Sequence, residues 1–227
     1  MSSHDHICSA AATGTIQDVE YFLKRSADVN EKGEKGRTPI HYAAHANSVE
    51  VVRYLVSKGA KVNVRDDTDM TPIEYAIVKG RTEIVKCLAE LGAEVNAKSS
   101  EGVPLIHLAT GTKQIEIIKC LVALGADINA SDNDGMTPIF IAAMGGQIEV
   151  MECLAELKTD IVNAPAPNGM TPIFGSVATD QMASMKCLMA LGANINAKTN
   201  DGGTLLSFAE SMGKIEAAKW LRANGAR

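Results

Sequence analysis

The sequence predicts an all-α repeat protein, in which short helical units stack side by side. The string Thr-Pro-Ile recurs at Thr38, Thr71, Thr137 and Thr171, in steps of 33 residues or multiples of 33, within one residue. Each string precedes a short segment rich in small residues, then a second segment with helical periodicity. A period of this length is typical of stacked repeats and argues against a globule with one central pocket.

The Thr-Pro pair predicts the start of the first helix in each repeat. Thr supplies the N-cap oxygen, and Pro fits the first helical position, where no backbone donor is needed. We expect this helix to break near Asn47, Gly80 or Gly146. The fourth repeat departs from the pattern, because Pro104-Leu105 replaces Thr-Pro and removes the capping hydroxyl.

The second helix is predicted by apolar residues at helical spacing, as in Val49, Val52, Leu55 and Val56. A glycine is expected to end it in the left-handed conformation, at Gly59, Gly92, Gly125 and Gly192. The Asp- and Asn-rich stretch 131–135 then predicts a protruding β-turn.

The strings TPIHYAA at 38–44 and GADINA at 125–130 resemble the consensus of the ankyrin repeat family, and the resemblance covers essentially the whole chain. It implies an all-α ankyrin solenoid of stacked β-turn and helix–turn–helix units that form a curved superhelix. We expect one domain, 1–227, with caps at both ends. Its repeats are approximately 1–33 (N-terminal cap), 34–66, 67–99, 100–132, 133–166, 167–199 and 200–227 (C-terminal cap).

Composition limits the function. The chain has 227 residues, a net charge of −5 and no run of Lys or Arg, so we expect no nucleic-acid partner. It has no 18-residue apolar run, and its first 20 residues lack a basic n-region and an apolar core, so we expect neither a membrane partner nor a secretory signal. We expect a cytoplasmic monomer, with the nucleus as the alternative location.

One stretch, 157–170, breaks the repeat pattern. Lys158 stands where a helix-ending glycine is expected, one residue is inserted near Val162, and Pro165 and Pro167 stiffen the turn. Three interpretations remain open: a weak joint in the stack, a feature shaped for a ligand, or drift in a tolerant loop.

Four cysteines, Cys87, Cys120, Cys153 and Cys187, occupy one repeat position, which Tyr21, Tyr54 and Trp220 fill elsewhere. We expect reduced, buried packing residues, because stacked helices lie about 10 Å apart, too far for disulfides.

No catalytic or metal-binding arrangement stands out. His4-Asp5-His6 has too few ligands for a metal site. The resemblance implies a structural role for His41 and His107, between neighbouring turns. We find no nucleophile motif or phosphate loop and expect no enzyme activity, catalytic residue, metal, cofactor or small-molecule substrate.

The resemblance also implies that partners contact the turn tips and the exposed side of the first helices. The residues at those positions are mostly apolar and include five methionines, which adapt to varied partner shapes. They are Arg37, Tyr42, His45, Met70, Tyr75, Val78, Val103, Leu108, Met136, Ile141, Met144, Met170, Phe208 and Met212. The other interpretation is that several of them, Tyr42, Leu108 and Ile141 above all, are half-buried packing residues.

These features favour a non-catalytic scaffold or adaptor that binds a protein partner through the turn tips and the concave first-helix face. Two alternatives stay open: an assembly chaperone or inhibitor of a larger complex, and a substrate of asparaginyl hydroxylation. The resemblance implies that the second would act on Asn30, Asn63, Asn96, Asn129, Asn163 and Asn196.

Overall fold

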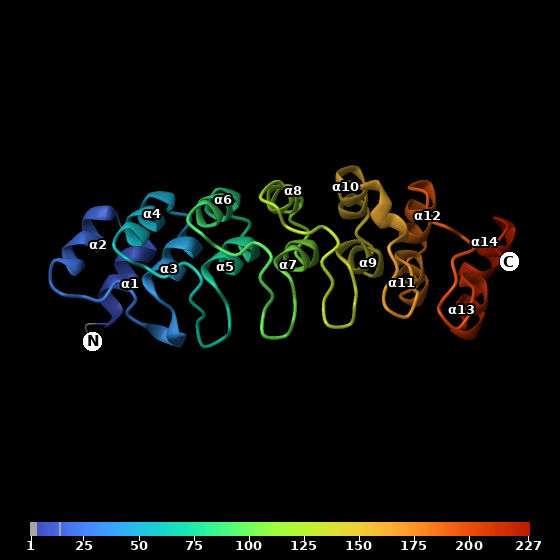
Figure 1. Cartoon of the computed structure of the whole chain (residues 1–227), viewed down its shortest axis with the longest axis horizontal. Coiled ribbons are helices and arrows are strands. Elements are labelled where there is room, and N and C mark those ends of the chain that lie inside the picture. The colour runs from blue at the N-terminus through green and yellow to red at the C-terminus, as the bar shows by residue number, and fades with distance from the viewer. Residues whose placement is uncertain (1–3, 14) are drawn as a thin grey trace. The chain divides into compact units, whose positions relative to one another are not determined.

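The structure is a computed structural model that describes residues 4–13 and 15–227, with side chains from residue 7 onward. Over those residues it contains fourteen α-helices, two short 3₁₀ helices and no β-strand (Figure 1). The first helix of each repeat is α1 (His4–Thr13), α3 (Pro39–Ala46), α5 (Pro72–Val78), α7 (Leu105–Gly111), α9 (Pro138–Met144), α11 (Pro172–Ala178) or α13 (Leu205–Ser211). The second helix is α2 (Ile16–Leu23), α4 (Val49–Ser57), α6 (Thr82–Glu90), α8 (Ile115–Ala123), α10 (Ile148–Leu157), α12 (Met182–Ala190) or α14 (Ile215–Ala223). The 3₁₀ helices are η1 (Glu34–Gly36) and η2 (Thr159–Asn163).

The chain divides into two compact units, which we describe separately. The first comprises Met1–Glu101 and Glu116–Ala126, and the second comprises Gly102–Ile115 and Asp127–Arg227. In the first unit, α3 packs between α1 and α5, and α4 packs between α2 and α6. In the second, α9 packs between α7 and α11, α11 also contacts α13, and α10 packs on α12.

The helices begin where the Thr-Pro strings predict. Thr71 is the N-cap of α5, with an extended backbone, and its hydroxyl accepts a hydrogen bond from the Glu74 amide at 3.5 Å. Pro72 follows at the first helical position, where it leaves no donor unsatisfied. Thr38, Thr137 and Thr171 hold the same N-cap position, but within the described part of the chain the hydroxyls of Thr137 and Thr171 are buried without a hydrogen bond, so the predicted capping bond is wrong at these two residues. At Pro104 the cap has no side-chain hydrogen bond, as expected for a residue without a hydroxyl.

The helix ends are left-handed, as predicted, and the breaks between the paired helices adopt the same conformation. Asn47, Gly80 and Gly146 have φ values of 68°, 67° and 67°, and the four helix-ending glycines lie between 90° and 97°. Lys113 and Asp180 adopt the same conformation, with φ of 58° and 60°, at equivalent breaks that the sequence did not reveal. A side chain is disfavoured there, so the packing of the two flanking helices holds these breaks in place.

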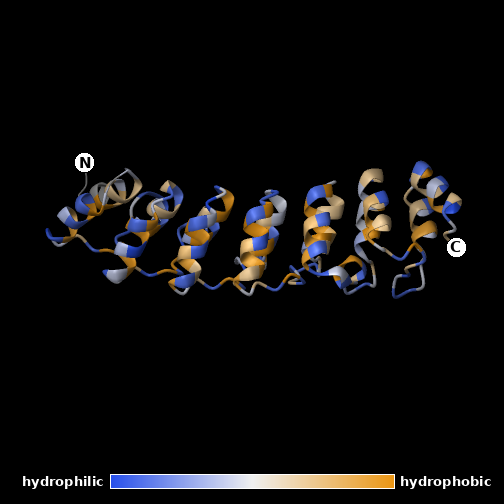
Figure 2. Cartoon of the chain, turned by 90° about the horizontal axis from the view of Figure 1, so that it is seen from above, coloured by the Kyte–Doolittle hydropathy of each residue, from blue (hydrophilic) through white to orange (hydrophobic). Residues whose placement is uncertain are grey.

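The core of each compact unit consists of stripes of small aliphatic residues. In α4, Val51, Val52 and Leu55 are buried, whereas Val49 and Val56, which the spacing also placed on the apolar stripe, are half-buried. Figure 2 shows the result from above, with hydrophobic and hydrophilic residues on different sides of the helices. Such helices gain most of their stability from this burial, because short helices are marginal alone.

Asparagine side chains join each helix end to the next. In the first unit, Nδ2 of Asn63 donates to the Gly92 carbonyl at 3.0 Å, and its Oδ1 accepts from the Glu94 amide at 3.2 Å. Asn30 and Asn96 donate at 3.0 Å to the carbonyls of Gly59 and Gly125 in the same unit, as Asn163 does to Gly192 in the second. Each amide therefore satisfies backbone groups that the end of a helix leaves without partners.

The irregular stretch 157–170 interrupts the series of asparagine links. Helix α10 runs to Leu157, Lys158 has an extended backbone, and η2 absorbs the inserted residue while it buries Ile161 and Val162. No glycine carbonyl is presented to the preceding asparagine, Asn129, whose Oδ1 is buried and accepts no hydrogen bond. The stretch thus lacks the asparagine link, but buried Ile161 and Val162 hold it against the core.

Three of the four aligned cysteines are buried as predicted: Cys87, Cys120 and Cys153. Cys187 is half-buried, which corrects the prediction for that position. Burial raises the pKa of Cys87, Cys120 and Cys187, and none of the four aligned cysteines forms a disulfide in the part of the chain that the structure describes.

We predict that N-ethylmaleimide labels Cys187 of the native protein well before Cys87, Cys120 or Cys153. Reaction requires an accessible thiolate, and the other three sulfurs become accessible only through local opening. Peptide mass spectrometry over a time course measures the order. Equal labelling rates at all four sites would show that burial does not control their reactivity.

We predict that Asn63→Ala lowers the free energy of unfolding by about 1–2 kcal/mol, because it removes two hydrogen bonds and strands their backbone partners. Asn129→Ala is the matched control and is expected to cost less, since its side-chain oxygen has no partner to lose. Urea denaturation of both variants tests this. A larger loss for Asn129→Ala would contradict the structural role assigned to the amide series.

Candidate functional site on the first-helix face

The fourteen residues proposed from the sequence as partner-binding form what we call the first-helix face. None of the fourteen is buried: His45, Val78 and Met212 are exposed, and the others are half-buried. Six of them, from Arg37 to Val78, lie in the first compact unit and eight, from Val103 to Met212, lie in the second. We therefore describe the face separately in each unit.

In the first unit, Tyr75 is part of a polar cluster. Its hydroxyl donates to Oδ2 of Asp66 at 2.7 Å and accepts from Nε of Arg37 at 2.9 Å. The Arg37 guanidinium also lies 5.0 Å from the centre of the Tyr75 ring. Tyr75 is thus held by its hydroxyl while its ring stays half-buried, whereas the sequence suggested only a large apolar contact.

Asp66 is the residue that sequence analysis missed. Its side chain is buried, and it accepts hydrogen bonds from Thr68 and from the Met70 amide in addition to Tyr75. Burial by itself would raise the pKa of Asp66, but these hydrogen bonds outweigh it and hold that pKa well below its usual range. The sequence signal that could have indicated this role is an Asp at the start of a turn rich in Asp and Thr, because such side chains accept hydrogen bonds from the backbone of their own turn.

His41 links neighbouring turns, as the family resemblance implied. The Thr38 amide donates to its Nδ1 at 3.1 Å, so the proton sits on Nε2, which lies 3.0 Å from the Met70 carbonyl. His107 makes the equivalent contact in the second unit, with Nε2 2.8 Å from the Met136 carbonyl. Burial is the main reason that the pKa of His41 is lowered. A neutral histidine in this setting is structural rather than a general base.

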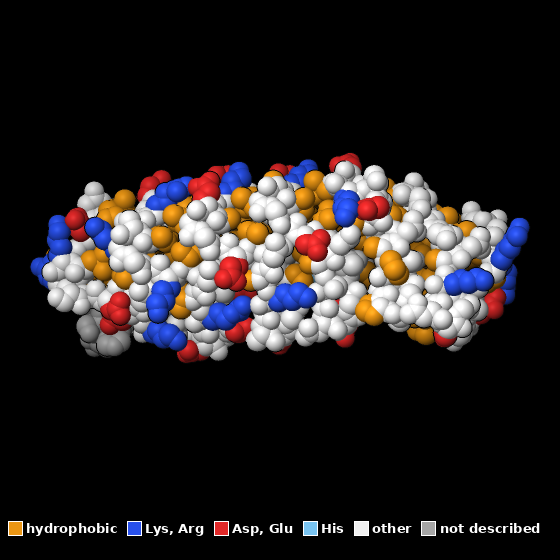
Figure 3. Space-filling model, in the orientation of Figure 1, with side chains coloured by type: hydrophobic (Ala, Val, Ile, Leu, Met, Phe, Trp, Pro, Cys, Tyr) orange, Lys and Arg blue, Asp and Glu red, His pale blue; other side chains and the backbone are white. Residues whose placement is uncertain are grey.

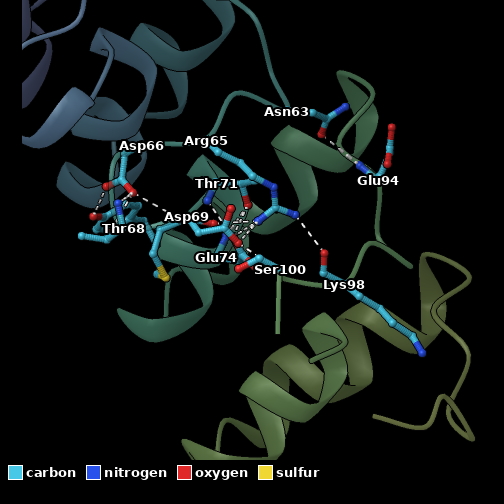
Figure 4. Close-up of polar contacts among 12 residues, drawn as sticks. Asn63, Arg65, Asp66, Thr68, Asp69, Thr71, Glu74, Glu94, Lys98 and Ser100 are labelled. Atoms are coloured by element: carbon cyan, nitrogen blue, oxygen red, sulfur yellow. Dashed lines mark hydrogen bonds and ion pairs between the residues drawn. The ribbon is translucent and has the colours of Figure 1, made fainter. Parts of the chain in front are cut away.

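In the third repeat, different residues link the neighbouring turns (Figure 4). Glu74 replaces the histidine and accepts from the Thr71 amide and hydroxyl at 2.6 and 2.7 Å, but a carboxylate cannot donate to the next turn. Arg65 does so instead: Nη2 donates to the Lys98 carbonyl at 2.9 Å and Nη1 to Asp69 Oδ2 at 3.0 Å. These charged groups are satisfied by each other, so they support the turns and offer little to a partner.

In the second unit, the face carries a hollow of about 560 Å³. Met170 and Phe208 form its apolar wall, and the ring of Phe208 packs edge-on against Phe174 with centroids 5.5 Å apart. Its polar lining is tied into local turns; for example, Asn200 Nδ2 donates to the Pro167 carbonyl at 2.8 Å. Two residues predicted to contact a partner therefore line one recess, with apolar groups toward solvent.

No group of three or more His, Cys, Asp or Glu side chains suited to a metal ion occurs among the described residues. The string His4-Asp5-His6 lies outside the side chains that the structure describes. Among the described helices, none has the length and apolar character needed to cross a membrane.

Comparison with known families agrees with this architecture. A family model for ankyrin repeats (3 copies) matches residues 7–99 and 92–165, which is more than half of the chain. The chain belongs to the ankyrin repeat family. Its fold is an all-α ankyrin solenoid, and ankyrin repeats are generally protein–protein interaction modules that are typically non-catalytic. No curated protein compared with the chain matches it.

We predict that the ankyrin protein loses stability as the pH falls from 7.5 to 5.5, and that His41→Gln loses less. The pKa of His41 is lower in the folded protein, so its contribution is fully present above the unfolded value of about 6.5 and is lost as pH falls toward the folded value. A difference of one pKa unit corresponds to about 1.4 kcal/mol.

Urea denaturation at the two pH values measures this effect. His45→Gln controls for the exposed histidine four residues further along α3, whose pKa is also lowered, mainly by burial. If wild type and His41→Gln lose equal stability, His41 is not the group that titrates.

Proposed function

We propose that this ankyrin protein is a non-catalytic scaffold or adaptor that binds a protein partner through the turn tips and the first-helix face. The observation that carries the proposal is the exposure of that face. Its residues are mostly apolar, yet solvent reaches every one of them, and Val78 and Met212 are 39% and 50% exposed. Exposed apolar side chains that recur along an array are what a protein-binding surface requires.

The second-helix side provides the contrast. Glu83 pairs with Lys86 at 2.8 Å on α6, and Glu216 pairs with Lys219 at 2.9 Å on α14. Figure 3 shows acidic and basic side chains next to each other along the edge where α4 and α6 lie. Such exposed pairs contribute little to stability, and a partner would have to desolvate them to bind there. The solvated side is therefore the poorer binding surface.

Within this proposal we place the protein in the cytosol, with the nucleus as the alternative, and we expect a monomer. An assembly chaperone or an inhibitor would use the same surface. A chaperone would be recovered with incomplete complexes and an inhibitor with the mature form. Asparaginyl hydroxylation would add the mass of one oxygen atom per site to the intact protein, and it is compatible with partner binding.

We predict that Val78→Ser combined with Met212→Ser weakens capture of the native partner by about tenfold or more, since contact residues that become buried contribute about 1–2 kcal/mol or more each. Both residues are exposed, so the fold is expected to stay intact. Quantitative affinity capture from the cells that make the protein, with circular dichroism as the folding check, measures the effect.

The matched control is Tyr21→Ser combined with Ile215→Ser. These side chains are 51% and 66% exposed, but they lie on second helices α2 and α14. The control is expected to retain the partner. Loss of the partner by the control, with retention by the first variant, would place the binding surface on the other side.

A further inference from the structure

The first compact unit concentrates positive charge on its part of the first-helix face. His45 lies in the last turn of α3, Lys79 is the C-cap of α5, and Arg81 is the N-cap of α6. We call Arg37, Lys79 and Arg81, together with the adjoining His45 ring, the cationic patch; its fixed charges are those of Arg37, Lys79 and Arg81. We infer that the patch binds an acidic segment of the protein partner, one that also carries an apolar or aromatic side chain; this inference rests on the proposed function.

The patch is compact. The charges that act on His45 belong to Lys79, Arg37 and Arg81, and after burial, which is the main cause, all three lower its pKa. Its ring lies 6.4 Å from the ring of Tyr75, so it borders the Arg37–Asp66–Tyr75 cluster. Arg37 and His45 thus lie beside Tyr75, and Lys79 and Arg81 follow the end of α5, the helix that carries it.

Most of this positive charge is uncompensated. Arg37 is the one member with an ion pair, to the buried Asp66 at 3.4 Å. Within the described part of the chain, Lys79, Arg81 and His45 have no ion pair, and Nε of Arg81 is buried without a hydrogen-bond partner. Arg53, Arg65 and Lys86 of the same unit, in contrast, each pair with a carboxylate. Like charges held close together repel one another, and a bound carboxylate would relieve that repulsion.

The residues next to the cationic patch indicate which kind of ligand it binds. Val78 and Tyr75 provide apolar surface directly beside the charges, which suits a peptide with carboxylates flanking an apolar side chain. A polyanion such as nucleic acid is disfavoured, because the chain as a whole carries a net charge of −5 and would repel it at longer range. Charge complementarity therefore favours a short acidic segment of a protein.

The test is selection of a random peptide display library on the full-length protein. Peptides enriched on the wild type are expected to carry net negative charge and an apolar or aromatic residue, and their affinity is expected to fall as NaCl is raised. Lys79→Glu combined with Arg81→Glu is expected to weaken the selected peptides by about tenfold or more. Lys58→Glu combined with Lys86→Glu, on α4 and α6, makes the same change in net charge and is expected to have little effect.

Lys79→Glu alone, compared with Lys86→Glu alone, guards against misfolding of the double variant, because both lysines are exposed. Neutral or basic peptides on the wild type would overturn the inference and leave the proposed function standing. Acidic peptides that bind the patch variants and the controls equally well would also overturn it. Equal affinity for a single-stranded oligonucleotide would overturn it in favour of nucleic acid, whereas no enrichment at all would count against the proposed function itself.

Discussion

Each helix pair of this protein can bury its apolar stripe only against its neighbours in the stack, and the rest of the structure follows from that constraint. Short helices such as α5 and α6 are marginal in isolation, so their stability comes from contacts such as those of α5 with α3. Small aliphatic side chains, Val52 and Leu55 among them, keep the layers thin. The small core of each layer leaves apolar residues on the first helices exposed.

Stacking brings unsatisfied backbone groups at helix ends and turns close together, and polar side chains resolve this in three ways. Asn63 bridges one helix end to the next, His41 bridges two turns, and Arg65 replaces the histidine bridge where Glu74 cannot donate. Asn129 shows what happens when the geometry changes: among the described residues, next to the insertion that forms η2, its buried Oδ1 accepts no hydrogen bond from a backbone amide. Polar links of this kind fix the spacing between repeats more tightly than apolar contacts can.

The two sides of the helix pairs then have different chemistry. The second helices carry Glu–Lys pairs that neutralise each other, as Glu83 and Lys86 do. In the first compact unit, Lys79 and Arg81, which follow the end of α5, instead have no carboxylate partner among the residues that the structure describes. Charged groups without a carboxylate partner beside exposed apolar surface are what a binding partner of opposite charge would recognise.

The sequence by itself determined the repeat period, the helix starts at residues such as Thr71, the left-handed helix ends and the free cysteine column. These are local properties, set by capping, by backbone conformation and by periodicity over a few residues. It also located the residues of the first-helix face, because the same few positions recur in the first helix and the preceding turn of successive repeats. It did not reveal the buried Asp66 carboxylate, the cap-like conformations of Lys113 and Asp180, the exposure of Cys187 or the cationic patch. Each of these depends on side chains that lie far apart in the chain, or on what covers a residue from the next repeat, and only the tertiary packing decides which groups meet and which remain without partners.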